Sequence, residues 1–294
     1  MSGIAGSDPQ AEQRQAAALR ASLEQRLKNR AQQEGLSIDR LRRQVTVERL
    51  LARLEGAQAG CWVLKGGMAL EVRLGGVARA TKDLDLGLRL APPDHQEAAD
   101  LLTEALVYDA DDHFDFTVIR VKPLAIERAG DILRASVRCR LAGREWATIQ
   151  VDIGIRTHEL AETERLRVPG NLEFADIAPP TIETIDLARH VAEKFHGMLV
   201  EFDDRENSRT RDLADLVLLV EHDLIDPAAA RSSIVDVFAE RDTALPAVLP
   251  ALPASWPSTY ASIAEEHGIH PASFDEAVNL IAGLWADLFP SQET

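Results

Sequence analysis

Two aspartates separated by one leucine, Asp83 and Asp85, are the residues whose type and spacing most directly suggest chemistry. They lie in the run Asp-Leu-Asp-Leu-Gly-Leu, an alternation typical of a half-buried β-strand, so both carboxylates are expected on one face, about 7 Å apart at Cα. Such a pair can reach one Mg²⁺ ion, which prefers oxygen ligands and completes its shell with water and substrate phosphates. A solvated strand face is the common alternative, so the pair alone does not define a site.

The segment Lys65-Gly66-Gly67 precedes the aspartates and separates a short apolar strand, 61–64, from a predicted helix, 68–74. Glycines before a helix let backbone N–H groups approach an anion, and the helix dipole favours negative charge there. Gly66 and Gly67 are therefore expected to cradle a phosphate, and Lys65 to neutralise part of its charge. The order strand, Gly-Gly, helix and Asp-x-Asp strand favours one functional site over unrelated turns.

A third carboxylate, Asp152, lies between Val151 and Ile153 in a predicted strand, 145–155, which forms a hairpin with the strand 132–141. If this strand lies beside the Asp83 strand, the three acids could hold two Mg²⁺ ions about 4 Å apart for phosphoryl or nucleotidyl transfer. An exposed strand aspartate without a metal role is an equal alternative.

Predicted helices flank these strands. Apolar spacing predicts helices over 11–34, 38–54, 94–107, 184–197, 208–222, 227–240 and 272–288. A further strand is expected at 116–122. The proline-containing stretch 161–182 is expected to be irregular, and the Pro-rich stretch 245–257 to link two helices.

Composition limits the class of protein. The 294 residues are 46% hydrophobic and 27% charged, which is ordinary for a globular protein. The sequence has no apolar run of about 20 residues and no signal-peptide pattern at its start, so a cytoplasmic protein without a membrane span is expected. The two cysteines lie in apolar stretches and are expected to be reduced and buried.

Charge is distributed unevenly along the chain. The net charge of −16 disfavours a protein that coats nucleic acid non-specifically, yet the first 60 residues contain ten Lys or Arg against seven Asp or Glu. This basic segment could meet RNA, contact the protein's own acidic surface, or form a solvated helix face; Arg42, Arg43 and Arg49 are candidates to face an open cleft. The acidic stretch 108–115 is expected to be a solvated loop.

Four segments together resemble the AbiEii-type nucleotidyltransferase toxins of the polymerase-β-like superfamily. They are Leu64–Leu70, Arg79–Leu86, Ala192–His196 and Arg211–Leu216, in family order over about residues 61–220. The resemblance implies an α/β (α+β) fold, with a polymerase-β-like nucleotidyltransferase lobe built on a small mixed sheet and a helical C-terminal lobe. The expected parts are N-terminal helices at 1–60 packing on the core, a nucleotidyltransferase core at 61–160 and a helical domain at 161–294.

The resemblance also implies roles for residues around the aspartates. Asp83 and Asp85 match the metal-binding pair, and Thr81 lies where the family has a small hydroxyl residue beside the triphosphate. Gly66 and Gly67 match the glycine pair at the helix start, although the superfamily signature is Gly-Ser, and Thr81 could replace the missing serine.

Two further matches lie in the C-terminal half. Lys194 matches the lysine taken to hold the phosphates of the nucleotide, and Asp212 matches an acid needed for activity, with Asp215 one turn further on. A third catalytic acid is not obvious in all members of the family, so the assignment of Asp152 depends on the strand argument alone.

The function that follows is a Mg²⁺-dependent nucleotidyltransferase toxin, since members transfer nucleotides from an NTP and some modify the 3′ acceptor end of tRNA and so stop translation. A cognate antitoxin is a possible partner. Two alternatives stay open. One is transfer of an AMP-type nucleotide to a protein such as the antitoxin, which the net acidity slightly favours; the other is a non-catalytic binding module with the same fold.

Overall fold

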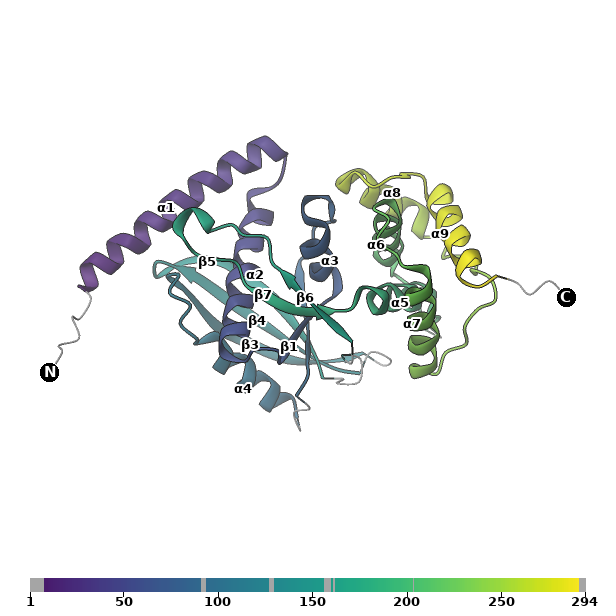
Figure 1. Ribbon diagram of the computed structural model, residues 1–294, viewed down its shortest axis with the longest axis horizontal. Coiled ribbons are helices and arrows are strands. Elements are labelled where there is room, and N and C mark those ends of the chain that lie inside the picture. The colour runs from purple at the N-terminus through teal and green to yellow at the C-terminus, as the bar shows by residue number, and fades with distance from the viewer. Residues whose placement is uncertain are drawn as a thin grey trace. The chain divides into compact units, whose positions relative to one another are not determined.

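The polypeptide forms a seven-stranded mixed sheet with flanking helices in the computed structural model, which describes residues 8–90, 94–126, 130–155, 160, 162–202 and 204–290 (Figure 1). The mixed α/β class expected from the sequence is confirmed. The chain divides into two units: residues 1–68, 82–161 and 165–184 form the first, and residues 69–81, 162–164 and 185–294 form the second.

The strand order in the described sheet is β3-β4-β5-β2-β1-β7-β6. The strands are β1 (Trp62–Lys65), β2 (Asp83–Leu88), β3 (Phe114–Ile126), β4 (Gly130–Leu141), β5 (Arg144–Gly154), β6 (Thr163–Arg167) and β7 (Thr181–Ile185). β2 pairs in parallel with β5 and antiparallel with β1, and β3, β4 and β5 form an antiparallel meander. The strand with the two aspartates is therefore central, with neighbours on both sides.

One face of this sheet is apolar and is covered by α2 (Ile38–Ala57) and α4 (His95–Leu106) (Figure 1). Alternation along β2 buries Leu84 and Leu86 on this face, so that Asp83 and Asp85 lie on the opposite, polar face. α1 (Pro9–Glu34) packs on α2 through a leucine stripe that includes Leu23, which is fully buried.

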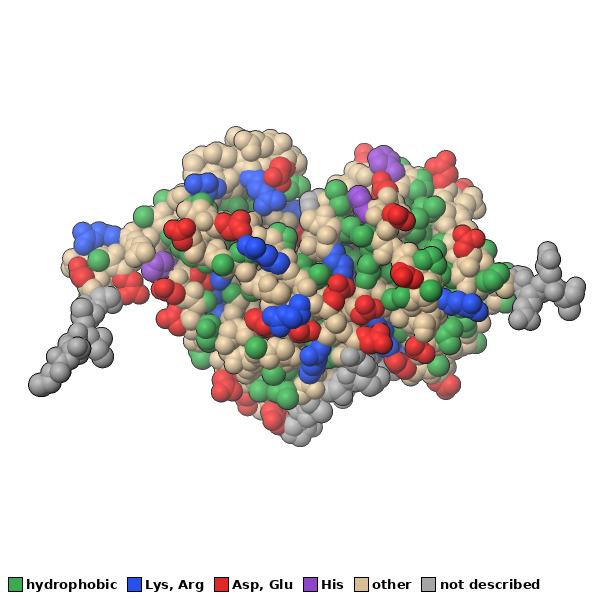
Figure 2. Space-filling model, in the orientation of Figure 1, with side chains coloured by type: hydrophobic (Ala, Val, Ile, Leu, Met, Phe, Trp, Pro, Cys, Tyr) green, Lys and Arg blue, Asp and Glu red, His purple; other side chains and the backbone are tan. Residues whose placement is uncertain are grey.

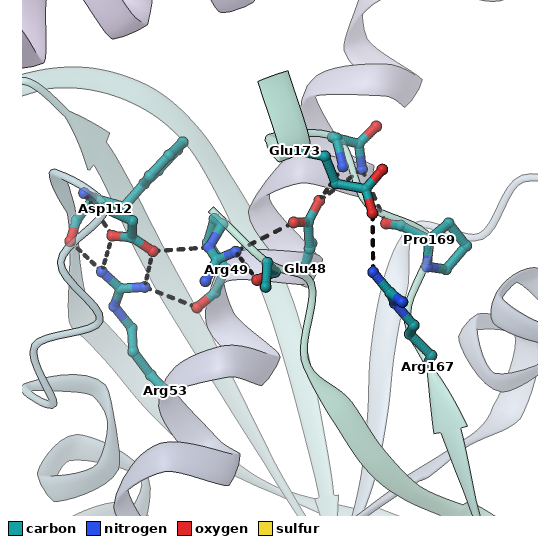
Figure 3. A network of polar contacts seen from close by, with 10 residues as sticks. Glu48, Arg49, Arg53, Asp112, Arg167, Pro169 and Glu173 are labelled. Carbon is teal, nitrogen blue, oxygen red and sulfur yellow. Dashed lines mark hydrogen bonds and ion pairs between the residues drawn. The ribbon is translucent and has the colours of Figure 1, made fainter. Parts of the chain in front are cut away.

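A buried network of charges joins α2 to two loops of the first unit (Figure 3). Arg49 and Arg53 both donate to Asp112, and Arg53 does so through two nitrogens at 2.8 and 2.6 Å. Glu48 accepts from the backbone and side chain of Asn171. The expectation of a solvated loop at 108–115 is therefore wrong at Asp112, which is 1% exposed, and Arg49 is buried rather than facing an open cleft.

Two further predictions from the sequence need correction. The stretch 161–182 is not irregular throughout, because β6 and the start of β7 lie within it and β7 pairs in parallel with β1. The Pro-rich stretch 245–257 does not lead directly to the last helix, because α8 (Trp256–His267) lies between. Pro179 and Pro180 lie just before the first residue of β7, so their missing N–H groups do not interrupt the hydrogen bonds between β7 and its neighbouring strands.

The second unit is mainly helical. It contains α5 (Leu187–Leu199), α6 (Thr210–Glu221), α7 (Pro227–Glu240), α8 and α9 (Phe274–Leu288) around a core that includes Phe195, Trp256 and Trp285. Asn207 donates to three carbonyls at the end of α5 and accepts from Trp256 Nε1 at 2.6 Å, which fixes the connection into α6.

The helix α3 (Gly66–Leu74) begins in the first unit, directly after β1, and ends in the second. None of the helices in the described ranges is long and apolar enough to cross a bilayer. Acidic side chains are scattered over the face drawn in Figure 2, in keeping with the net charge of −16.

Candidate active site

A row of four charged residues crosses four neighbouring strands of the first unit. Asp85 on β2 lies opposite Lys65 on β1 and opposite Asp152 on β5, and Asp152 in turn lies opposite Arg134 on β4. Residues directly opposite one another in a sheet share a face, and Asp83, two residues before Asp85, shares it too. The expectation that the strand of Asp152 lies beside the strand of Asp83 is thus confirmed.

Gly66 lies directly against Asp85. Its φ is +60°, in the left-handed region that favours glycine, and a Cβ atom on this residue would lie 1.9 Å from Asp85 Oδ2. The turn after β1 therefore requires glycine both for its backbone and for the carboxylate that occupies the space. This contact brings the expected phosphate-binding turn and one acid of the Asp-x-Asp pair together. Gly67 follows in the first turn of α3.

The donor set of Asp83 and Asp85 fits a divalent cation that keeps part of its water shell. Both are carboxylates on the same face of β2, and the side chain of Asp83 is 46% exposed, which leaves room for water or phosphate oxygens there. Within the described ranges, no group of three His, Cys, Asp or Glu side chains is placed to hold a metal ion. A cation on this pair would need further oxygen ligands from water or substrate.

Asp152 is bound by Arg134 instead. Arg134 Nε lies 2.6 Å from Asp152 Oδ1, and Nη2 lies 2.5 Å from Oδ2. The same Nη2 lies 3.9 Å from Asp83 Oδ2. The hydrogen bond with Asp152 raises the pKa of Arg134, with further contributions from the charges of Asp152, Asp83 and Asp85. Whether Asp152 also serves as a metal ligand stays a prediction.

A second charged cluster lies within the second unit. Lys194 on α5 lies 2.8 Å from Asp212 Oδ1 and 2.7 Å from Asp215 Oδ2, both on α6. Arg79 adds a two-point contact to Asp215, with distances of 2.6 and 2.9 Å. All four residues are at least nine-tenths buried. The structure thus brings together the lysine and the acid that the sequence singles out, with Asp215 and Arg79 beside them.

Electrostatics keep this cluster ionised. Burial by itself lowers the pKa of Lys194, but the charges of Asp212 and Asp215 outweigh it and raise that pKa above its ordinary value. Burial raises the pKa of Asp215, but Lys194 and Arg79 outweigh it and hold that pKa below its ordinary range. A Cβ on Gly197 would lie 2.6 Å from Asp212 Oδ2, so glycine on α5 is what lets this acid approach.

The remaining candidate, Thr81, is buried two residues before β2, in the segment 69–81 of the second unit. Two functional candidates were missed by sequence reasoning: Arg79, which belongs to a quoted motif but was given no role, and Arg134. A buried arginine needs a carboxylate partner. The available signal for Arg79 was that α6 carries two acids, Asp212 and Asp215, one turn apart, so that one of them could pair with a second cation besides Lys194.

Comparison with known proteins supports one family. The family model described as "Nucleotidyl transferase AbiEii toxin, Type IV TA system" matches residues 49–280. No curated protein matches the chain. Among solved structures, MenT4, a nucleotidyltransferase toxin from Mycobacterium tuberculosis, has a TM-score of 0.57 at 22% identity, over 93% of this chain and 90% of that one.

The structure of JHP933 from Helicobacter pylori has a TM-score of 0.47 at 18% identity, over 86% of this chain and 93% of that one. The likeness to MenT4 shows a shared fold, and the family match extends over far more than half of the sequence, including the Asp-x-Asp strand, Lys194 and Asp212. The chain belongs to the AbiEii family of nucleotidyltransferase toxins of type IV toxin–antitoxin systems.

Proposed function

We propose that this nucleotidyltransferase uses Mg²⁺ and transfers a nucleotide from an NTP to the 3′ acceptor end of tRNA, which would block translation. The observation that carries the proposal is the contact of Asp85 with the glycine turn at Gly66, with Asp83 on the same face of the sheet. This arrangement offers cation ligands beside a turn whose backbone can approach phosphate. A Mg²⁺ ion held by Asp83 and Asp85 would neutralise charge on the α-phosphate.

In the transfer itself, the oxygen of an acceptor hydroxyl bonds to the α-phosphorus and gives up its proton to water. The bond from that phosphorus to the oxygen bridging to the β-phosphorus breaks, and pyrophosphate leaves. We propose that Lys65, Gly66 and Gly67 bind phosphate oxygens of the nucleotide, and that the hydroxyl of Thr81 does the same. For the second cluster we propose that Lys194 binds phosphate and that Asp212 orients its ammonium group, 2.8 Å away.

A basic face on β3 and β4 supports a nucleic-acid acceptor. It consists of Arg120, Lys122, Arg134, Arg138 and Arg140, whose pairing positions place them on the face of the sheet that carries Asp83 and Asp85. Among the described residues, Arg120, Lys122, Arg138 and Arg140 have no ion-pair partner within 4.0 Å. Asp115 and Glu145 lie opposite Arg140, but Arg120, Lys122 and Arg138 add positive charge to this face. In a chain of net charge −16, such a local basic face favours binding of a polyanion at this face over non-specific binding elsewhere.

The direct test is transfer of label from each α-³²P-labelled NTP to total tRNA in the presence of Mg²⁺. The proposal expects label on tRNA and none on tRNA whose 3′-terminal diol has been oxidised with periodate, because the acceptor hydroxyl is then destroyed. Label on the antitoxin or on the toxin itself, with none on tRNA, would instead support protein modification. Equal labelling of intact and oxidised tRNA would contradict the proposed acceptor position.

A charge-reversal pair tests the basic face. Arg138→Glu with Arg140→Glu is expected to weaken tRNA binding at least about tenfold at low salt and to flatten its salt dependence, since phosphate contacts are lost. The matched control is Lys28→Glu with Arg144→Glu, which changes the net charge equally beside the groove lined by α1. A larger loss of tRNA affinity in the control would show that tRNA binds near the basic N-terminal segment and not on β3 and β4.

A further inference from the structure

Arg134 takes both oxygens of Asp152, the acid that three-carboxylate metal chemistry would require. The two guanidinium nitrogens lie 2.6 and 2.5 Å from the two carboxylate oxygens, in the two-point geometry that arginine forms best. The side chain of Asp152 is only 13% exposed, so little of the carboxylate remains accessible to another cation. The pairing follows from the strands themselves, since Arg134 and Asp152 are directly opposite on β4 and β5.

The guanidinium also reaches toward the Asp-x-Asp pair. Arg134 Nη2 lies 3.9 Å from Asp83 Oδ2, so a fixed positive charge adjoins the acids on which the first metal ion would bind. Next to the Asp-x-Asp pair the same face carries Lys65, opposite Asp85, and Arg134, opposite Asp152. A second divalent ion beside the guanidinium would be repelled by it.

An arginine keeps its positive charge beside Asp152 under all ordinary conditions. A guanidinium does not lose its proton in proteins, and its planar fork matches a carboxylate in two-point geometry. A second cation at Asp152 would therefore lie directly beside a guanidinium that keeps its positive charge at every accessible pH. Arg138, a basic residue on the same face of β4, lies opposite Thr148 on β5 and therefore has no carboxylate directly opposite it on that strand.

We propose that Arg134 is a positioning residue that holds Asp152 out of the metal shell and stands in for a second divalent ion. The site on Asp83 and Asp85 then takes a single divalent cation together with the nucleotide. This inference rests on the proposed nucleotide-dependent function. In it, Asp152 pairs with Arg134 and is not a ligand of a two-metal centre.

The test counts bound Mn²⁺ by electron paramagnetic resonance in the presence of a non-transferable α,β-methylene NTP analogue. The wild-type protein is expected to bind one Mn²⁺ per nucleotide complex. Arg134→Gln releases Asp152 and is expected to bind two, and the double variant Arg134→Gln with Asp152→Asn returns to one. Arg134→Lys, which keeps a cation beside Asp152, is expected to bind one, as is the control Arg138→Gln.

A second arm uses Mn²⁺ alone, without nucleotide. Arg134→Gln is expected to bind it at least about tenfold more tightly than wild type, and the double variant to lose this gain. Thermal unfolding checks that each variant is folded, and we expect folding to be retained because the side chain of Arg134 is 30% exposed. Two Mn²⁺ per complex in the wild-type protein, or no gain in Arg134→Gln in either arm, would overturn the proposal.

Failure of the proposed function looks different. If the analogue does not bind at all, the nucleotidyl-transfer assignment of this site fails, whereas the Mn²⁺-only arm still decides the role of Arg134. If the analogue binds with two Mn²⁺ ions in the wild type, nucleotide use stands and only the single-cation inference is wrong.

Discussion

The carboxylate of Asp85 occupies the space that a side chain on residue 66 would need. Gly66 follows β1 directly and Asp85 lies on β2, so the antiparallel pairing of these strands brings the two together. The Oδ2, Cγ and Cβ atoms of Asp85 would lie 1.9, 2.7 and 3.0 Å from an added Cβ. The glycine is therefore required by a close approach and by its φ of +60° at the same position.

Gly66→Ala is expected to abolish nucleotide transfer, because the new methyl group forces the Asp85 carboxylate out of its place. Transfer from labelled NTP should fall at least about 100-fold, in the range found when one preorganised group is removed from an active site. The left-handed backbone should add a cost of about 1–3 kcal/mol to the free energy of folding.

Gly143→Ala separates the two effects. Gly143 has a φ of +69° in the β4–β5 turn, yet an added Cβ there would meet nothing within 4 Å. This variant should lose similar stability in urea unfolding and keep the wild-type transfer rate. If Gly66→Ala and Gly143→Ala transfer nucleotide equally well, the close approach of Gly66 and Asp85 has no role in activity.

The two acids that contact Lys194 are expected to differ in role: Asp215 contributes mainly to the stability of the fold, and Asp212 to nucleotide transfer. Asp215→Asn removes the buried carboxylate that contacts both Arg79 and Lys194, so a loss of about 3–5 kcal/mol in the free energy of unfolding is expected. Asp212→Asn keeps the pair of Lys194 with Asp215, so about 1–3 kcal/mol is expected, with loss of transfer.

Asp236→Asn, on the exposed side of α7, is the control and should change stability by about 0.5 kcal/mol or less. Urea unfolding of all three variants, followed by circular dichroism, measures the differences. A loss in Asp215→Asn no greater than that in Asp236→Asn would show that the buried cluster does not hold α5 and α6 together.

The buried pair of Asp112 with Arg53 and Arg49 predicts a dependence on pH. Burial raises the pKa of Asp112, but the two arginines and the Phe114 N–H outweigh it and bring that pKa below its ordinary 3.8. The charged form is thus stabilised on folding. Its contribution is fully present at pH values well above 3.8 and is lost as pH falls through the lower, folded-state pKa.

Asp112→Asn should therefore be less stable than wild type by a difference that is constant between about pH 7 and pH 5 and that narrows below about pH 4. Glu48, whose pKa is raised by burial, is present in both proteins and cancels in the difference. Urea unfolding at pH 3 to 7 measures it, with Asp109→Asn in the same loop as control. A difference that widens on acidification would contradict the assigned sign.

Local patterns were enough to predict much of the fold. The alternation in β2, the apolar stripes of α1 and α2 and the hairpin signal between β4 and β5 all correspond to observed elements. These features depend on neighbours in sequence, which is why periodicity detects them. The grouping of Asp83, Asp85 and Asp152 also followed from strand patterns, once β5 was placed beside β2.

Contacts that depend on strand register or on distant segments could not be predicted in this way. A simple turn at 142–143 pairs Leu141 with Arg144 and would place Arg134 opposite Val151, but the irregularity at Cys139 and Arg140 shifts the pairing by one residue to Asp152. The polar alternation of both strands was the available signal for this shift.

Long-range burial accounts for the other omissions. Arg79 and Asp215 are 136 residues apart, and nothing local indicates that they meet. Two prolines directly before β7 made its sequence look irregular. The strand forms through parallel pairing with β1, which is more than 100 residues away in sequence. Asp112 lies in an acidic stretch that composition alone marks as solvated, and only its arginine partners on α2 explain its burial.

The central claim is that Asp83 and Asp85 hold the cation at which nucleotide transfer occurs. The most direct measurement is the rate of label transfer from α-³²P-NTP by Asp83→Asn, with thermal unfolding and circular dichroism run beside it. The account predicts a rate at least about 100-fold below wild type in a protein that is folded as wild type is. A folded Asp83→Asn variant that transfers nucleotide at the wild-type rate would contradict it.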